Sequence, residues 1–527
     1  GTDFFTVVQA HGLKAGPIAS NNLSEGGQIL KLSRSLPAST PSADNSSISF
    51  SHTGTTQVVR THGNATLTNP SLTDIKPEKK QLVDQTGVVL NSTQLDFTLN
   101  LEKQKDKNNA EFYATAANAY ADLSLVGGDL GIAKGKSLAY YVGDTAAGYK
   151  AFTYDPTKKE GARFYDTNND GIADTASLRF VDGGYGDKDG VKNGSILDPG
   201  AAAAADGINA SLSTSEQAVV VKDATNANAM VAVNLKASLT ARATTANEIG
   251  YIVLNDGETA TFSTLTDRAQ VLFSNLENSD VPDLTRFSFQ RQLSLVNGQS
   301  LRFFEVTDTS LSALAAGKSS IEALGKDFQW LGSTVTGGVA TFSSTSGINF
   351  KLELSGDALG LSQLLAQEQA NAPLLDFTGM GGKSLSASYV LAREANYNSS
   401  LSFYRVLDVV GTVKDSATGQ SYRPGDANYA AVAKANQVSS ISNLTVGNLK
   451  LGNGDVTLNE TSYLAPMAVV NGSDTFFAFA AANSDGLAHF RSLGDNIIGL
   501  EDMRGGGDRD YDDLIIQMTP NSLTTIA

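Results

Sequence analysis

The feature that most restricts the fold is an alternation of apolar and polar residues with a period of two. In residues 348–354, Ile348, Phe350, Leu352 and Leu354 alternate with polar residues. This pattern places one face of a β-strand against a core and the other in water. Such segments recur about every ten residues, a spacing typical of β-sandwiches. We therefore predict a mainly β protein of several β-sandwich-like modules with few short helices.

Helical spacing of apolar residues is confined to three segments of the chain. They are residues 308–324, residues 358–369 and residues 426–435, the last of which follows Arg423-Pro-Gly. Proline and glycine before a periodic segment are typical of a helix start. We predict helices in these three segments and strands or turns elsewhere.

The chain length of 527 residues predicts three or four domains at roughly 150 residues each. We expect an N-terminal β region at 1–110, a calcium-binding β domain at 111–216, a β module at 217–380 and a related β module at 381–527. The turn-rich first 85 residues contain short strands that can complete a neighbour's open sheet edge, so the N-terminal region is a candidate connector between copies. The alternative is an ordinary β domain with its own core.

The expected relation between the last two modules rests on two similar segments of the sequence, which we call the echo segments. Residues 300–308 read SLRFFEVTD and residues 400–408 read SLSFYRVLD, in the same register. Two related β modules are therefore expected in the second half of the chain.

Composition excludes several classes of protein. The 39 basic and 55 acidic residues give a net charge of −16, which opposes non-specific binding to nucleic acid or anionic lipid. With no cysteine, disulfides and thiolate metal sites are excluded. No apolar stretch approaches the roughly 20 residues of a membrane span. Residues 1–8 lack a basic start and a long apolar core, and we interpret them as a mature N-terminus after processing.

The first acidic cluster has the spacing of a calcium loop. In residues 166–174 (DTNNDGIAD), oxygen-bearing side chains occupy positions 1, 3, 5 and 9, and glycine occupies position 6. Ca²⁺ takes six to eight oxygen ligands, and glycine permits the sharp bend. Ser177 stands at position 12 in place of glutamate, and no flanking helices are evident, so this is not an EF-hand. The candidate ligands here are Asp166, Asn168, Asp170, the carbonyl of Ile172, and Asp174.

More acids follow directly downstream. Seven aspartates lie between residues 166 and 198 against three basic residues, and carboxylates this close repel one another unless a cation lies between them. The alternative is a series of solvated Asp-Gly turns. The additional candidate ligands for Ca²⁺ are Asp182, Asp187, Asp189, Asn193 and Asp198.

The second acidic cluster lies near the end of the sequence. Glycines 505–507 allow the backbone to fold back, so that the acids before them can face the acids after them across one cation. The alternative is that Arg504 and Arg509 pair with these acids at the surface. The candidate calcium ligands are Glu501, Asp502, Asp508, Asp510 and Asp513.

Residues 464–518 resemble the DUF4114 family. The similarity rests on Ala-Pro-Met at 465–467, Phe477-Ala-Phe-Ala-Ala-Ala-Asn483, His489 and Glu501-Asp-x-x-Gly-Gly-Gly-Asp-x-Asp, and it extends over about 385–520. The resemblance implies a module of secreted, calcium-associated bacterial surface proteins, often cyanobacterial.

Two further resemblances lie upstream. Residues 140–200 are similar to a choice-of-anchor U type of β domain of exported bacterial proteins. Residues 246–355 look like a diverged copy of the C-terminal module. Both resemblances imply a secreted protein of the cell surface or extracellular matrix.

A catalytic constellation is not apparent in the sequence. The four histidines stand apart, with no HExxH, and neither a G-x-S-x-G elbow before a helix nor a P-loop is present. The acids occur in groups of seven, which suits a cation better than an acid/base pair. His489 near the C-terminal acids is more readily a structural group. We expect that the protein is not an enzyme.

The favoured function is a structural one. We expect a self-assembling subunit of an S-layer or extracellular filament, with Ca²⁺ bracing its loops and copies of itself as partners. The alternative is a calcium-dependent adhesin that binds glycans or other cell-surface components, with Trp330, the sole tryptophan, stacking on a sugar ring. A secreted hydrolase is the third class.

Overall fold

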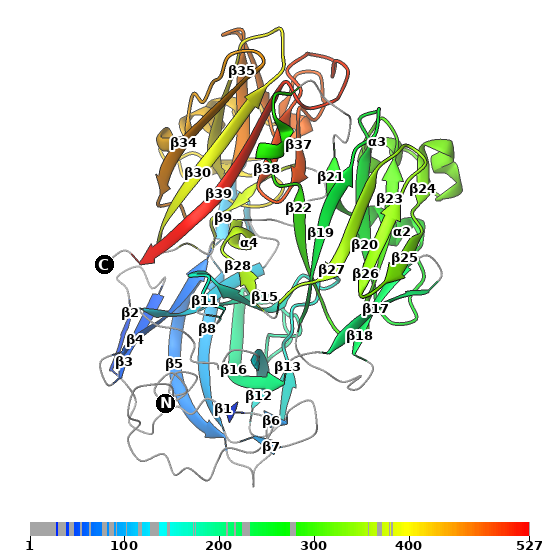
Figure 1. Cartoon of the computed structure of the whole chain (residues 1–527). Coiled ribbons are helices and arrows are strands. Elements are labelled where there is room, and N and C mark those ends of the chain that lie inside the picture. The colour runs from blue at the N-terminus through cyan, green and yellow to red at the C-terminus, as the bar shows by residue number, and fades with distance from the viewer. Residues whose placement is uncertain are drawn as a thin grey trace.

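The structure of the chain is a computed structural model (Figure 1). Outside the ranges given next, it describes only the backbone of strands. Side chains are described for residues 101, 103–112, 139–142, 150–171, 173, 175–197, 209–215, 218–223, 232–274, 281–356, 358–365, 372–378, 380 and 383–524.

The middle module is a sandwich of two antiparallel sheets. Its core includes Phe303, Phe342 and Phe350, whose ring centroids lie 4.4–5.3 Å apart. One sheet has the order β17 (Ala210–Ser215), β18 (Ala218–Asp223), β23 (Ser300–Val306), β20 (Glu248–Leu254), β21 (Gln270–Ser274), with β24 (Phe328–Trp330) on β23. The other has the order β22 (Gln290–Leu295), β19 (Val233–Ala241), β27 (Asn349–Leu354), β26 (Val339–Ser343), β25 (Ser333–Thr336).

The C-terminal module is a second sandwich. Its core includes Leu385, Phe403, Leu464 and Ile516, all buried. One sheet has the order β29 (Leu375–Asp376), β35 (Tyr463–Val470), β31 (Ser399–Val406), with β36 (Asp474–Phe477) on β35. The other has the order β34 (Lys450–Leu458), β30 (Lys383–Arg393), β39 (Leu514–Thr525), β38 (Ile497–Leu500), β37 (Phe490–Gly494).

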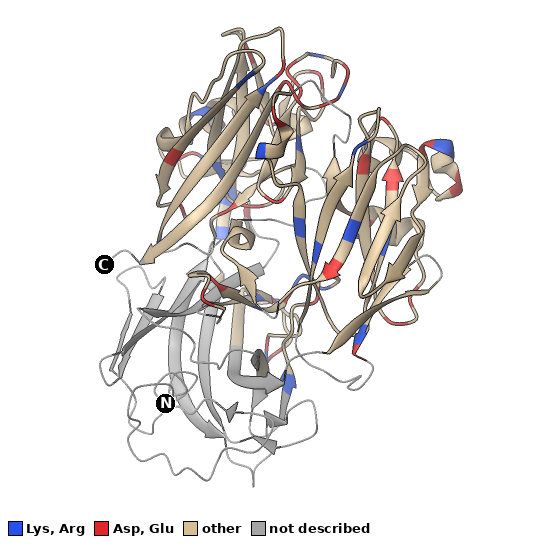
Figure 2. Ribbon diagram, viewed as in Figure 1, with Lys and Arg blue, Asp and Glu red and all other residues tan. Residues whose placement is uncertain are grey.

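The mainly β prediction is confirmed by these sheets. The alternating segment 348–354 covers β27, in which Phe350 and Leu352 are buried, with Ile348 buried just before it. The two echo segments form β23 and β31, one strand in each sandwich. In Figure 2, charged residues lie mostly in loops and near strand ends, while most of the strand length is neutral.

The helix predictions are correct in part. Helix α5 (Tyr429–Ala435) forms as expected, and α4 (Ser362–Leu365) lies in the second segment, where residues 366–371 are outside the described residues. The prediction of one helix over 308–324 is wrong. That segment contains only α3 (Leu311–Leu314) and the start of the 3₁₀ helix η3 (Glu322–Asp327), because Gly317 has a φ of 69° that ends helical geometry.

Helix α2 (Phe262–Arg268) was not predicted from the sequence. Thr261 and Thr264 cap it reciprocally, each hydroxyl accepting from the other residue's backbone N–H. This capping box, with Thr264 in place of the usual glutamate or glutamine, is the local sequence signal from which the helix start could have been predicted. Among the described residues, no helix combines the length and apolarity needed to cross a membrane.

Two large sheets of the N-terminal half each contain strands from both sides of the boundary expected near residue 110. The strands of the first 85 residues pair with later strands of the same chain, for example β4 with β11 and β5 with β8. The connector role of residues 1–85 and the alternative of an ordinary β domain both stay predictions. One sheet has the order β13 (Gly148–Ala151), β12 (Lys136–Asp144), β16 (Ser195–Asp206), β8 (Ser92–Leu101), β5 (Ala65–Ile75), with β1 (Gln28–Ile29) on β16. The other has the order β2 (Ala38–Pro41), β3 (Ser47–His52), β4 (Thr55–His62), β11 (Asn118–Val126), β15 (Thr175–Val181), β14 (Gly161–Asp166), β28 (Leu359–Gly360), and a two-stranded sheet joins β6 (Leu82–Val83) to β7 (Val89–Leu90).

A hairpin from the N-terminal half reaches the C-terminal module. Strands β9 (Lys103–Asp106) and β10 (Glu111–Tyr113) share a sheet with β33 (Gln420–Tyr422) and β32 (Val413–Lys414). The β9–β33 pairing is parallel, and Lys107 forms an ion pair with Asp426 beside it. Segments some 300 residues apart are thus joined by main-chain hydrogen bonds.

The middle and C-terminal sandwiches meet through a buried junction, with β21 beside β37 (Figure 1). At its centre, Arg291 of β22 donates from Nη1 to Asp495 Oδ1 at 3.3 Å and from Nη2 to Ser492 Oγ at 2.7 Å. Asp495 Oδ2 accepts the Gln292 N–H at 2.8 Å. Both Arg291 and Asp495 are buried. Burial raises the pKa of Asp495, and Arg291 opposes that rise.

An apolar cluster also joins the two modules. Phe287 of the middle module packs with Leu493, Ile497 and Ile515 of the C-terminal module. Main-chain groups also join the two modules, because the Asp495 N–H donates to the Gln290 carbonyl at 2.9 Å. The two sandwiches therefore share one buried interface that contains both apolar and ionic groups.

Candidate metal centre

The C-terminal acidic cluster lies in the loop that joins β38 to β39. Because these strands are antiparallel neighbours with Leu500 opposite Leu514, the loop of residues 501–513 must return to its starting point. Glycines 505–507 all have positive φ, as do Arg509 at 63° and Tyr511 at 58°. Repeated left-handed turns fold the loop tightly and bring its two limbs together.

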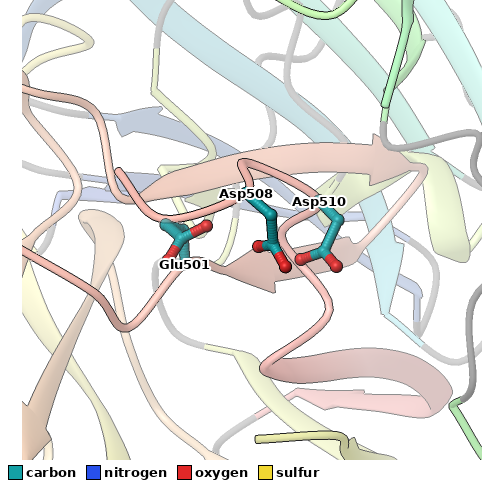
Figure 3. Close-up of side chains that lie close together, drawn as sticks. All are labelled: Glu501, Asp508 and Asp510. Carbon is teal, nitrogen blue, oxygen red and sulfur yellow. The ribbon is translucent and has the colours of Figure 1, made fainter. Parts of the chain in front are cut away.

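Five carboxylates converge inside this loop. Glu501, Asp508 and Asp510 form one group, and Glu501, Asp502 and Asp513 form another, with one oxygen of each member within 4.8 Å of the others. Figure 3 shows the first group, with Glu501 on one limb of the loop and Asp508 and Asp510 on the other. These are the five ligands predicted from this part of the sequence. Glu501 belongs to both groups and is the central residue.

The carboxylates crowd one another, with Glu501 and Asp502 buried, Asp510 and Asp513 half-buried and Asp508 exposed. Burial raises the pKa of Glu501 to about 7, with the charges of Asp508 and Asp510 adding to the rise. Burial also raises the pKa of Asp513, and the charges of Asp502 and Glu501 raise it further. A cation among these oxygens would favour the charged carboxylates and so lower the pKa of both Glu501 and Asp513.

The arginines of the loop were the alternative partners for these acids. Arg504 instead donates to Asp474 Oδ1 at 2.8 Å, outside the loop. The backbone N–H of Arg509, and not its guanidinium, donates to Glu501 Oε2 at 2.8 Å. Glu501 Oε1 accepts the Met503 N–H at 3.0 Å. These bonds orient the carboxylate of Glu501 and leave each oxygen a further lone pair for a metal ion.

The two acidic groups suit a hard divalent cation. Together they bring five carboxylates to one loop, and Ca²⁺ takes six to eight oxygen ligands at 2.3–2.6 Å. Carboxylate oxygens without nitrogen or sulfur ligands are the donor set of Ca²⁺ or Mg²⁺ and not of zinc. Water and backbone carbonyls commonly complete such a shell.

His489 and Asp485 hold the loop of residues 501–513 through hydrogen bonds to its backbone. His489 Nδ1 lies 2.7 Å from the Glu501 carbonyl oxygen, and Nε2 lies 3.0 Å from Asp485 Oδ2. Hydrogen bonds, including one from the Gly505 N–H, outweigh the effect of burial and lower the pKa of Asp485. Both ring nitrogens of His489 thus face oxygen atoms, and the ring links the Asp485 side chain to the Glu501 backbone.

His489 is therefore a positioning residue that does not touch the carboxylates of the metal groups. Its ring is fully buried and stacks on Phe476 at 3.7 Å. The structural interpretation of His489 agrees with this placement. The spacing of four residues between Asp485 and His489 could have indicated that these two side chains meet. Nothing in the sequence indicated the contact of His489 with Glu501.

The predicted loop at 166–174 uses its oxygens internally. Asp166 accepts the N–H groups of Asp170 and Gly171, and Asn168 Oδ1 accepts the Asp170 N–H at 3.0 Å. Ile172 and Asp174 lie outside the described residues. In the described part of this loop the side chains close turns.

The downstream acids behave in the same way. Asp182 accepts the N–H groups of Asn193 and Gly194, and Asp187 accepts those of Gly183 and Leu197. Asp189 accepts the Val191 N–H and the Asn193 side-chain amide, and the side chain of Asp198 is outside the described residues. Within the described residues, none of the candidates between 166 and 198 joins a group of three metal-ligating side chains.

Trp330, the candidate sugar platform, does not present a free ring face. The Arg302 guanidinium lies over the ring at 4.1 Å, and Phe304 and Phe328 contact it edge to face. The tryptophan therefore packs against its own module.

Residues 441–521 match a known family, described as "Domain of unknown function (DUF4114)". The resemblance of the C-terminal segment is confirmed over these residues. The DUF4114 match runs from before β34 into β39 and contains all five carboxylates of the loop, Asp485 and His489. It excludes β30 and β31, which complete the sandwich. A comparison with curated proteins finds no match.

Gly507 allows the close approach of Glu501 inside the DUF4114 segment. A Cβ atom at this position would overlap Glu501 Oε1, whereas a Cβ at Gly505 would meet nothing within 4 Å. We expect Gly507→Ala to weaken calcium binding at least tenfold, equivalent to about 1.4 kcal/mol, as measured by calorimetric titration. Gly505→Ala is the matched control, because Gly505 also has positive φ. Equal losses in both variants would show that backbone strain alone matters.

The raised pKa of Glu501 predicts a pH dependence of stability without calcium. Between the ordinary value of 4.5 and about 7, the unfolded chain releases this proton while the folded chain retains it. The free energy of unfolding should therefore fall as pH rises through this window. Thermal melts in chelator should show a smaller fall for Glu501→Gln than for the unmodified protein. Identical pH profiles would contradict the assignment.

Proposed function

We propose that the protein is a structural protein of an extracellular surface, a subunit that assembles with its own copies into an S-layer or filament stabilised by calcium. The observation that carries this proposal is the loop of residues 501–513, where five carboxylates converge, two of them buried, two half-buried and one exposed. Extracellular calcium sites are typically weak, with Kd values of about 10⁻⁴–10⁻³ M, and fill where calcium is abundant. This supports a secreted protein at the cell surface or in the extracellular matrix.

The position of the loop supports a structural role for the ion. The loop begins directly after β38, and the turn between β37 and β38 carries Asp495 of the junction. An ion bound to Glu501 and Asp513 would fix β38 against β39. Through β38 it would also steady the buried contact between the two sandwiches.

The net charge of −16 supports a second effect of calcium. Copies of a strongly acidic chain repel one another, and bound or bridging divalent cations reduce that repulsion. Assembly between copies should therefore require calcium. A crowded group of five carboxylates that orient one another also supports cation binding over acid/base catalysis.

Electron microscopy of the purified full chain tests this proposal. With millimolar calcium we expect ordered sheets or filaments, and with chelator we expect dispersed particles. Glu501→Gln in calcium should resemble the chelated protein, and Glu353→Gln, at a half-buried acid of the middle module, should assemble normally. A chain that stays monomeric at high concentration in calcium would overturn the structural role. Specific calcium-dependent binding on a glycan array would then favour the adhesin.

A further inference from the structure

A cavity of about 240 Å³ lies in the middle module, far in sequence from the acidic loop. It is formed between the sheet that contains β20 and β23 and the segments that cover this sheet. Leu265 of α2 and Leu311 of α3 pack with Ile252 and Phe304 in one apolar cluster beside it. The cavity thus lies beside a well-packed apolar cluster of the middle module.

A carboxylate forms one wall of the cavity. Glu248, the first residue of β20, lines it and is only 5% exposed. Its Oε1 accepts the Leu311 N–H at 2.9 Å, which fixes the side chain at the cavity wall. Burial raises the pKa of Glu248, and the charge of Arg491 opposes that rise.

The cavity contains a second acceptor that is not satisfied. Gln270 also lines it, and the buried Gln270 Oε1 has no hydrogen-bond partner among the described residues. Thr266 Oγ1 donates to the Phe262 carbonyl at 3.0 Å, and Ser312 Oγ lies 3.1 Å from Ser310 Oγ, where either hydroxyl can donate. The cavity therefore offers two acceptors to a ligand, the Glu248 carboxylate and Gln270 Oε1.

The rest of the wall is aliphatic. Leu311, Ala315 and Ala316 line the cavity on the α3 side. A ligand that fits the two acceptors and this aliphatic wall has hydrogen-bond donors, a positive charge and a short hydrocarbon body. An ammonium group has three donors and no acceptor. Calcium needs more oxygens than one carboxylate and one amide supply.

We propose that this cavity binds a primary alkylammonium group, with the charged head at Glu248 and Gln270 and the hydrocarbon chain against Leu311, Ala315 and Ala316. The group can be a small free amine or the side chain of a lysine on another polypeptide, since both present the same chemistry. The proposed binding does not require calcium.

The test is calorimetric titration of the full chain with n-butylammonium in the presence of chelator. We expect saturable one-to-one binding, with n-butanol and butyrate at least tenfold weaker because they lack the charge or carry the opposite one. Glu248→Gln keeps the shape of the side chain and the acceptor for the Leu311 N–H, and it should weaken binding at least tenfold. Glu258→Gln, at an acid of the same module paired with Arg268, should bind as the unmodified protein does.

A second variant guards against misfolding of the first. Ala316 lies at the exposed rim of the cavity, so Ala316→Leu should fill the space, keep Glu248 intact and abolish binding without lowering the melting temperature. Equal affinity for butanol, full binding by Glu248→Gln, or no saturable binding by the unmodified chain would each overturn the proposal.

The two sources of the group are separated by a further titration. A lysine blocked at its α-amine and carboxyl should bind more tightly than n-butylammonium if the natural occupant is a protein lysine, and more weakly if it is a free amine. Loss of binding when the side-chain amine is acetylated is expected in both cases. Retention of binding after acetylation would contradict the ammonium chemistry.

Discussion

Asp495→Ala is expected to lower the free energy of unfolding by about 3–5 kcal/mol, because it leaves Arg291 buried and without its ionic partner. Arg291 is 4% exposed and lies where the two sandwiches meet. The substitution also removes the acceptor of the Gln292 N–H. Urea unfolding followed by tryptophan fluorescence and circular dichroism should show this loss. We further expect the single transition of these two modules to separate into two.

The double substitution Arg291→Met with Asp495→Leu is the informative companion. It removes both charges and fills the space with apolar side chains, so it should recover much of the stability that the single substitution loses. Glu353→Gln removes one partner of half-exposed ion pairs with Lys236 and Lys351, and it should cost less than about 1 kcal/mol. A loss of less than about 1 kcal/mol for Asp495→Ala would mean that the ion pair between Arg291 and Asp495 does not hold the junction.

Calcium is expected to stabilise the folded chain through the loop of residues 501–513. At about 10 mM calcium, a site with Kd of about 10⁻⁴–10⁻³ M adds on the order of 1.4–2.7 kcal/mol to the free energy of unfolding. Differential scanning calorimetry with calcium and with chelator measures this gain. Glu501→Gln should abolish most of it, because Glu501 belongs to both carboxylate groups.

Asp166→Asn is the matched control for the calcium effect. It alters the loop with calcium-like spacing, where Asp166 closes turns by accepting backbone N–H groups. The calcium-dependent rise in melting temperature should persist in this variant. If Asp166→Asn removes the rise and Glu501→Gln does not, calcium binds in the N-terminal half and the C-terminal assignment fails. An unchanged melting curve in chelator, with no calcium by elemental analysis, would contradict both sites.

Local patterns predicted the secondary structure well where they were strong. The alternation around Phe350 became β27 because a period of two is a property of neighbouring residues and needs no distant contact. Helix prediction over 308–324 failed because one glycine with positive φ outweighs the apolar spacing on either side of it.

The two acidic segments show the limit of spacing as a signal. Both have acids and glycines at calcium-like intervals, and both were predicted to bind the ion. The acids of both segments accept nearby backbone N–H groups, but only at 501–513 do they also converge on one another among the described residues. Antiparallel flanking strands do not make this difference, because residues 166–174 also join antiparallel neighbours, with Tyr165 opposite Thr175. At 501–513 three glycines, Arg509 and Tyr511 have positive φ and fold the longer loop back on itself.

By itself, the sequence determined the β class, the C-terminal family segment and the five acids of its loop, because each is encoded by residues close together in the chain. Only the tertiary structure decided that Arg291 meets Asp495 across 204 residues, that β9 pairs with β33, and that His489 holds the Glu501 carbonyl. These contacts depend on which buried polar groups find partners when whole sheets pack. A buried arginine or carboxylate must be satisfied, but its sequence neighbours do not reveal which distant group will satisfy it.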